Sequence, residues 1–141
     1  MMSDRYLFRG KQFNSGKWII GYYSFLPKGN FCVHDRHLIS WASVDKDGFE
    51  QELIDPTTLG QCTDLKDKNG KLIFEGDIVR CGYTEADGEE HSSDEPVAWR
   101  DCGWVLLYGD TYNILDNNDC GRYEVIGNIH DKPELLEVNN G

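Results

Sequence analysis

"LKDKNGKLIFEGDIV", residues 65–79, sets polar, turn-forming residues between short apolar runs. Asp67 and Asn69 precede Gly70 in the first polar group, and Gly76 precedes Asp77 in the second. Carboxylates and glycines at this density occur in metal and phosphate sites, but they also occur in tight turns. The order of apolar and polar groups favours turns between strands, so we expect these carboxylates to belong to the scaffold.

Two turn types compete for the first polar group. A two-residue loop at Asn69 and Gly70 would place Lys68 opposite Lys71, and like charges that face each other across a ladder repel. A type I turn that ends at a left-handed Gly70 would instead place Asp67 opposite Lys71. Asp is favoured at the first position of such a turn, and Gly adopts a positive φ at little cost. We therefore predict the type I turn.

The rest of the chain repeats this alternation of apolar segments and turn residues. Fifteen Gly and four Pro among 141 residues favour many short elements. Residues 103–109 are apolar on both faces, which predicts a central strand, and we expect 112–115 and 122–129 to pair as a hairpin. The expected strands cover 6–10, 17–25, 31–40 with an interruption near Asp35, 44–53 with a turn at Asp47-Gly48, 72–74, 78–83, 103–109, 112–115 and 122–129.

Two short helical turns are also expected. Asp55 and Pro56 suit the cap and first position of a one-turn helix within residues 54–61, with Gly60 releasing the chain. Asp131 and Glu134 have the spacing of a capping box, which predicts one helical turn near the C-terminus. The residues assigned to structural turns and caps are Asp55, Pro56, Gly60, Asp67, Asn69, Gly70, Gly76, Asp77, Gly127, Asp131 and Pro133.

Residues 84–95, TEADGEEHSSDE, contain six acidic side chains and no Lys or Arg. Because the segment also has no large apolar side chain, it buries too little surface to offset the entropy lost on ordering. We therefore expect an acidic mobile loop between two strands.

The chain has 25 Asp and Glu against 14 Lys and Arg, a formal charge of −11. Such a charge keeps a protein soluble, and it is also compatible with an acidic mimic of nucleic acid that occupies a DNA-binding protein. Direct nucleic-acid binding requires clustered basic residues. The one candidate stripe comprises Arg5, Arg9, Lys11 and Lys17, on or near a hairpin that we expect from the strands 6–10 and 17–25, so we do not expect direct binding.

Cysteine usage indicates a reducing compartment. The five Cys are odd in number and include no C-x-x-C pair, so we expect buried free thiols rather than disulfides. The first ten residues lack a basic segment followed by an apolar run, and no apolar stretch approaches the length of about 20 residues that spans a bilayer. We expect a cytoplasmic protein without membrane association.

Candidate metal and catalytic groups are sparse. Cys32, His34 and His37 form C-x-H-x-x-H, but a structural zinc needs four ligands, and on a strand His37 would point away from the other two. The segments 85–90 and 116–119 do not meet the EF-hand template for calcium. No thiol is marked as activated by a basic setting. We therefore expect no metal, cofactor or catalytic site.

Five motifs together resemble the YopX family of small phage and prophage proteins. They are FRGK (8–11), GKWIIG (16–21), DPTTLGQ (55–61), LKDKNGKLIFEGDIV (65–79) and IGNIHDKPELL (126–136). The chain departs from the family pattern at Cys62 and Asp64, and residues 84–95 look like a variable insertion. The resemblance implies an all-β fold of several small sheets and a phage or prophage accessory protein in a bacterial cytoplasm. It implies no mechanism or ligand, so no functional residue can be carried over.

The sequence therefore predicts an all-β protein of several short antiparallel sheets and hairpins, with one short C-terminal helical turn. We expect one domain over 1–141 with lobes of about 1–60 and 61–141, and exposed sheet edges favour a homo-oligomer. The expected function is non-catalytic protein binding or self-assembly, with a protein partner of unknown identity. The alternatives are an acidic nucleic-acid mimic, an unrecognised hydrolase and direct nucleic-acid binding.

Overall fold

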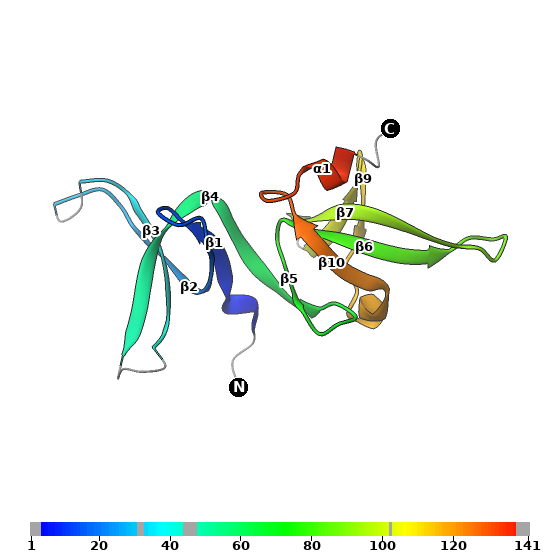
Figure 1. Ribbon diagram of the computed structural model, residues 1–141, viewed down its shortest axis with the longest axis horizontal. Coiled ribbons are helices and arrows are strands. Elements are labelled where there is room, and N and C mark those ends of the chain that lie inside the picture. The colour runs from blue at the N-terminus through cyan, green and yellow to red at the C-terminus, as the bar shows by residue number, and fades with distance from the viewer. Residues whose placement is uncertain (1–3, 31–32, 44–47, 102, 138–141) are drawn as a thin grey trace. The chain divides into compact units, whose positions relative to one another are not determined.

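The computed structural model describes residues 4–30, 33–43, 48–101 and 103–137, and in these ranges the chain is all-β (Figure 1). The strands form two antiparallel five-stranded sheets, and a single α-helix, α1 (Glu134–Glu137), follows the last strand. This confirms the expected fold class. The strands are β1 (Phe8–Gln12), β2 (Trp18–Leu26), β3 (Arg36–Ala42), β4 (Phe49–Lys66), β5 (Leu72–Phe74), β6 (Asp77–Thr84), β7 (Glu90–Arg100), β8 (Gly103–Tyr108), β9 (Thr111–Ile114) and β10 (Tyr123–Asn128). Two 3-10 helices are η1 (Asp4–Tyr6) and η2 (Asn117–Arg122).

The chain divides into two compact units, residues 1–62 and residues 63–141, with the boundary inside β4. The sequence predicts a division near residue 60. The two units differ in charge. Unit 1 has seven acidic and seven basic residues, whereas unit 2 has 18 acidic and seven basic residues, so the whole formal charge of −11 lies on unit 2.

Unit 1 is built from β1, β2, β3 and most of β4. These strands pair in that order, and β1 also pairs with β4, so the pairings close into a ring. Ile39 and Ile54 are fully buried on the inner face. A Cβ on Gly21 would lie 2.2 Å from the Ser40 carbonyl oxygen, and one on Gly10 would lie 2.7 Å from Ile54 Cδ1. Glycine at these two positions is therefore what allows the strands to approach.

A bulge in β4 stands where the helical turn was expected, and that expectation is wrong. Arg9 of β1 pairs with Gly60 and Lys11 pairs with Asp55, so the β4 residues between these pairs bulge out of the ladder. Proline is tolerated in a sheet at such a bulge, and Pro56 lies there. Gly60 continues the strand and does not release a helix.

Asp55 organises this bulge instead of capping a helix. Its Oδ1 accepts hydrogen bonds from the Thr57 N–H (3.0 Å) and the Thr57 hydroxyl (2.8 Å). The Thr58 hydroxyl accepts the Lys11 N–H (2.8 Å) and donates to the Asp55 carbonyl (2.6 Å). Local side chains thus bond the backbone groups where the ladder is interrupted, which is the same property that makes Asp and Thr good helix caps.

The expected strand over 31–40 begins only at Arg36, where β3 starts. Residues 33–35 precede it without strand structure, and Asp35 Oδ1 accepts the Lys28 N–H (2.7 Å). Cys32 and Asp47 lie outside the described residues. After them Gly48 leads into β4, and its carbonyl accepts the Ser43 N–H (3.2 Å).

Unit 2 contains a sheet in the order β10-β6-β7-β8-β9. The expected hairpin of 112–115 with 122–129 is wrong, because β9 and β10 lie at opposite edges of this sheet. The segment between them forms η2, capped by Asp116, whose Oδ1 accepts the Asn118 N–H (2.9 Å). β10 then pairs with β6. The buried core of the unit comprises Ile73, Val79, Cys81, Val97, Leu106, Leu115 and Tyr123.

Residues 84–95 form the outer part of the hairpin of β6 and β7, so their expected loop structure is wrong. β6 continues to Thr84, which pairs with Glu90, and only the five residues between them make the turn. Arg80 donates two hydrogen bonds to Asp94 across the hairpin (2.8 and 3.0 Å), and the Tyr83 and His91 rings stack at 5.6 Å. Ladder hydrogen bonds and cross-strand pairs therefore order a segment that has no large apolar side chain.

The turn at residues 67–71 has the type I form. The Gly70 N–H donates to the Asp67 carbonyl (3.0 Å), Gly70 has φ of +81°, and the Asp67 N–H donates to the Lys71 carbonyl (2.8 Å). The Asp67 Oδ1 accepts the N–H groups of Asn69 and Lys71, both at 2.9 Å. The carboxylate is buried and belongs to the scaffold.

The second oxygen of Asp67 reaches a distant strand. Asp67 Oδ2 accepts the Val125 N–H of β10 (2.9 Å), and the Lys68 N–H donates to the Tyr123 carbonyl (2.9 Å). Burial raises the pKa of Asp67, but the hydrogen bonds from Val125, Lys71 and Asn69, with the charge of Lys71, bring it below the usual 3.8. The turn therefore closes the outer edge of β10 with an ionised carboxylate.

The second polar group of the opening stretch is also structural. Asp77 is buried at the start of β6, and its Oδ2 accepts the Phe74 N–H (2.7 Å). Gly76 has φ of +88°, its N–H donates to the Val97 carbonyl (2.9 Å), and its carbonyl accepts the Ile129 N–H (2.9 Å). The turn between β5 and β6 is thereby tied to two other segments of unit 2.

The C-terminal segment forms the expected helical turn. α1 begins at Glu134, directly after Pro133, and Asp131 Oδ2 accepts a hydrogen bond from the Asn128 side-chain amide (3.0 Å). A Cβ on Gly127 would lie 3.0 Å from Leu135 Cδ1, so the glycine makes room for α1. Within the described ranges no helix is long and apolar enough to span a membrane.

Replacing Gly21 by alanine tests the close approach in unit 1. The new methyl group would meet the Ser40 backbone, so we expect Gly21→Ala to lower the free energy of unfolding by about 3 kcal/mol. Chemical denaturation followed by circular dichroism measures the change. Gly29→Ala is the control, because the nearest atom to a Cβ there would be the Pro27 carbonyl oxygen at 4.0 Å, which is an ordinary van der Waals contact. Equal stability of the two variants would contradict the packing argument.

Replacing Asp67 by asparagine tests the edge closure. An amide offers one acceptor oxygen to three N–H donors, so we expect Asp67→Asn to lose about 1–3 kcal/mol at pH 7. Because folding lowers the pKa of this carboxyl, its contribution is present above pH 3.8 and is lost as the pH falls through the folded pKa. Denaturation at several pH values should show the difference from wild type shrinking below that pH.

The matched control for this variant is Asp87→Asn. Asp87 is exposed at the hairpin tip and accepts one N–H, from Glu89 (2.9 Å), which an asparagine oxygen also accepts. A loss at Asp87 as large as that at Asp67, or a loss at Asp67 that does not depend on pH, would show that the carboxylate does not hold the β10 edge.

Candidate functional site

An exposed apolar surface covers one face of the unit 1 sheet. Cross-strand partners share a face of a sheet, and successive residues alternate between faces. The pairs Tyr22–Ser40, Leu38–Leu53 and Ala42–Phe49 therefore mark the face opposite to the inner one. Leu38 is buried on this face, but five other large apolar side chains there are 41% to 71% exposed. We call this set the unit 1 apolar face: Ile20, Tyr22, Leu26, Phe49 and Leu53.

Basic residues border this face but do not form a free stripe. Arg9 is buried, and its guanidinium lies 4.8 Å from the centroid of the Trp18 ring. Lys11 Nζ lies 5.5 Å from the same ring, and Arg5 lies 4.9 Å from the Tyr6 ring. Three of the four residues of the stripe considered in the sequence thus pack on aromatic rings of the protein itself.

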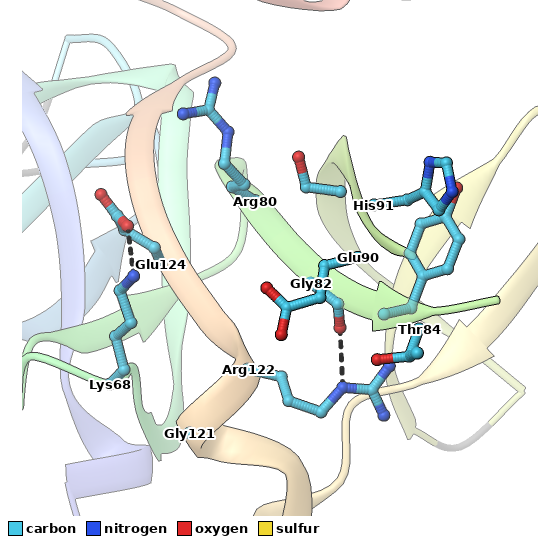
Figure 2. Close-up of a pocket in the computed structure, with 11 residues that line it drawn as sticks. Lys68, Arg80, Gly82, Thr84, Glu90, His91, Gly121, Arg122 and Glu124 are labelled. Atoms are coloured by element: carbon cyan, nitrogen blue, oxygen red, sulfur yellow. Dashed lines mark hydrogen bonds and ion pairs between the residues drawn. The ribbon is translucent and has the colours of Figure 1, made fainter. Parts of the chain in front are cut away.

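Unit 2 contains a groove of about 810 Å³ beside β6, β7 and β10 (Figure 2). Its cations already have partners. Lys68 Nζ lies 2.8 Å from Glu124, Arg80 is bonded to Asp94, and the Arg122 Nε donates to the Gly82 carbonyl (2.7 Å). The groove lining comprises Lys68, Arg80, Gly82, Tyr83, Thr84, Glu90, His91, Ser92, Gly121, Arg122 and Glu124. Because its charges are engaged within the protein, the groove has little capacity for an anion.

A smaller hollow of about 460 Å³ borders β9 and η2. Burial raises the pKa of the Cys81 thiol and of the Tyr108 and Tyr123 phenols. These groups are therefore protonated at neutral pH, whereas a nucleophilic thiol requires a lowered pKa. The lining comprises Cys81, Tyr83, Ser93, Leu106, Tyr108, Asn113, Ile114, Asp119, Arg122 and Tyr123.

The hairpin tip brings together three potential metal ligands that sequence reasoning missed. The ligand atoms of Glu85, Asp87 and His91 lie within 4.8 Å of one another, and Glu85 lies 3.6 Å from His91. Each of the three is at least partly exposed. The EF-hand template could not find this set, because it depends on the hairpin register that places residue 91 beside the turn. It offers three donors to a divalent cation.

The C-x-H-x-x-H grouping does not assemble in the described residues. His37 Nδ1 lies 2.6 Å from the Tyr23 hydroxyl, and its ring packs against Phe25 at 4.9 Å. His34 is exposed in the segment before β3, and Cys32 lies outside the described ranges. His37 is thus part of the packing of unit 1.

The unit 1 apolar face was not predicted from the sequence, although a signal for it exists. Gly21 marks the inner face of β2, and Ile20 and Tyr22 flank it, so alternation places both on the outer face. The turn and cap residues assigned from the sequence do not gather at either hollow. Those that organise turns, above all Asp55, Asp67, Gly76 and Asp77, do so through backbone groups.

Comparison with known proteins places these features in a family. No curated protein matches the chain. Among solved structures it is similar to protein EF1440 from Enterococcus faecalis, with 26% sequence identity and a TM-score of 0.52. That similarity covers 92% of this chain and 96% of the other. The family model described as YopX protein matches residues 8–137, and the chain therefore belongs to the YopX family.

Proposed function

We propose that this protein is a non-catalytic phage or prophage accessory module of the bacterial cytoplasm that acts by binding another protein. The observation that carries the proposal is the unit 1 apolar face. Soluble monomeric proteins rarely expose large contiguous apolar patches, and those that do generally use them as interfaces. Tyr22 and Phe49 add aromatic side chains, which are enriched among residues that dominate binding energy.

The charge distribution supports the same use of unit 1. This unit has no net charge, while unit 2 has −11. A neutral, apolar surface loses little on desolvation when a partner covers it, whereas an acidic surface must surrender solvated charges. Unit 2 is then free to keep the whole protein soluble.

Nucleic-acid mimicry is the second candidate, because all of the formal charge is on unit 2 and the hairpin tip is acidic. A mimic needs carboxylates that face solvent in an array. Asp94 is instead neutralised by Arg80, and Glu124 by Lys68. Protein binding through unit 1 is therefore the better-supported function.

Replacing Tyr22 by lysine tests the unit 1 apolar face. We expect tagged wild-type protein to capture one stoichiometric, nuclease-resistant protein from a lysate of its bacterial host, and Tyr22→Lys to weaken that capture about 30-fold, which is about 2 kcal/mol. The control is Tyr6→Lys, because Tyr6 has the same exposed fraction of 48% and lies outside the face. Equal capture by both variants, or capture that nuclease abolishes, would refute the proposal.

The thiol that borders the smaller hollow gives a test against catalysis. Each unit by which a pKa is raised lowers the thiolate fraction about tenfold, so we expect Cys81 to react with iodoacetamide more slowly than the half-buried Cys120 at pH 7.5. Mass spectrometry of digested protein measures both rates. Selective, rapid alkylation of Cys81 would instead indicate an activated nucleophile and favour an enzyme.

A further inference from the structure

The two edge strands of the unit 2 sheet differ in whether their outward backbone groups are hydrogen-bonded. The outer edge of β10 is closed by Asp67 and Lys68, which bond the Val125 N–H and the Tyr123 carbonyl. β9 forms the other edge, and within the described ranges β8 is the sole strand paired with it. All four β9 residues are exposed. An unprotected edge strand is a template for another extended chain.

The register of β9 shows which backbone groups point outward. The Leu115 N–H donates to the Trp104 carbonyl of the neighbouring β-ladder (2.9 Å). Since inward and outward groups alternate along an antiparallel strand, the N–H and C=O groups of Tyr112 and Ile114 point away from β8. Their side chains are 40% and 70% exposed. β9 itself contains no charge and no proline, the usual devices that protect an edge.

Charge at the ends of β9 selects the kind of chain that can pair with it. The exposed carboxylates of Asp110 and Asp116 flank the strand, and unit 2 as a whole carries −11. Two copies of β9 could pair antiparallel through the outward N–H and C=O groups of Tyr112 and Ile114. Such pairing would bring Asp110 of each copy toward Asp116 of the other. Like charges opposite each other destabilise a ladder, and opposite charges stabilise it. The flanks therefore disfavour a second copy and favour a basic segment.

We propose that β9 is a docking edge for an extended, basic segment of another protein, which joins the unit 2 sheet as a sixth strand. Apolar side chains of the segment lie beside Tyr112 and Ile114, and Lys or Arg lies beside Asp110 and Asp116. Alternate side chains on the opposite face meet the hollow that Asn113 borders. Main-chain hydrogen bonds supply affinity in this mode, and the side chains supply specificity. The edge is separate from the unit 1 apolar face.

Selection from a displayed library of random 12-residue peptides on full-length protein tests the proposal. We expect enriched peptides with apolar residues at alternate positions and Lys or Arg near both ends. Ile114→Pro removes an outward N–H without removing a β8–β9 hydrogen bond, so it should weaken binding of an enriched synthetic peptide at least about tenfold. Ile114→Thr keeps the N–H and should weaken it less.

Two further measurements complete the test: charge variants, and hydrogen exchange on the wild-type protein. Asp110→Asn should weaken peptide binding several-fold and Glu89→Gln, an equal charge change at the hairpin tip, should not. Hydrogen exchange on wild-type protein should show new protection of the Tyr112 and Ile114 amides when the peptide binds, a readout that does not depend on whether the proline variant folds.

Several results would overturn the proposal. They are a library that yields no enriched peptides, enriched peptides that are acidic, binding insensitive to Ile114→Pro, and exchange of the two amides unchanged by the peptide. Ultracentrifugation that shows a wild-type dimer abolished by Ile114→Pro would assign the edge to a second copy instead. Because Tyr22→Lys should leave peptide binding intact, failure of the unit 1 proposal and failure of this one are distinguishable.

Discussion

The carboxylate of Asp67 is the interaction on which unit 2 most depends. It bonds two N–H groups of its own turn and one N–H of β10, so a local turn and a strand that is distant in sequence share one ionised group. A buried carboxylate left without such donors would be strongly destabilising, because desolvation opposes its charge. Three N–H groups reverse that penalty here. The turn therefore cannot change without releasing the strand that follows η2.

The features predicted from the sequence are those whose causes lie within a few residues. The type I turn follows from Asp67, Lys71 and Gly70, which are contiguous enough for charge and stereochemistry to decide it. The contact of Asp67 with Val125 spans 58 residues and left no local trace. The all-β class was likewise predictable, because turn residues and short apolar runs recur throughout the chain.

The incorrect predictions share a physical cause. Strand pairing orders segments whose side chains alone do not indicate a strand. Residues 84–95 lack apolar bulk, yet the Arg80–Asp94 pair and the ladder make them a hairpin. Residues 54–61 contain Asp-Pro, a helix signal, but pairing with β1 makes them part of a strand that contains a bulge. Neighbouring segments 112–115 and 122–129 were natural hairpin partners, and β10 bonds to β6 instead. For the candidate site, the glycine on β2 separates the two faces of the strand. The sequence alone does not show which face is exposed, because that depends on the partner strands.

Sheet edges link these findings to binding. An unpaired strand edge exposes backbone donors and acceptors and invites association, so proteins close or protect most of their edges. In unit 1 the pairing of β1 with β4 closes the ring, and what remains open is an apolar face. In unit 2 a buried carboxylate closes β10, and what remains open is β9, uncharged within the strand and acidic at both ends. Each unit thus exposes one type of surface that could bind a partner. In unit 1 this surface is apolar, and in unit 2 it is a strand edge with backbone hydrogen-bonding groups. Surfaces so different in chemistry would suit partners of different chemistry.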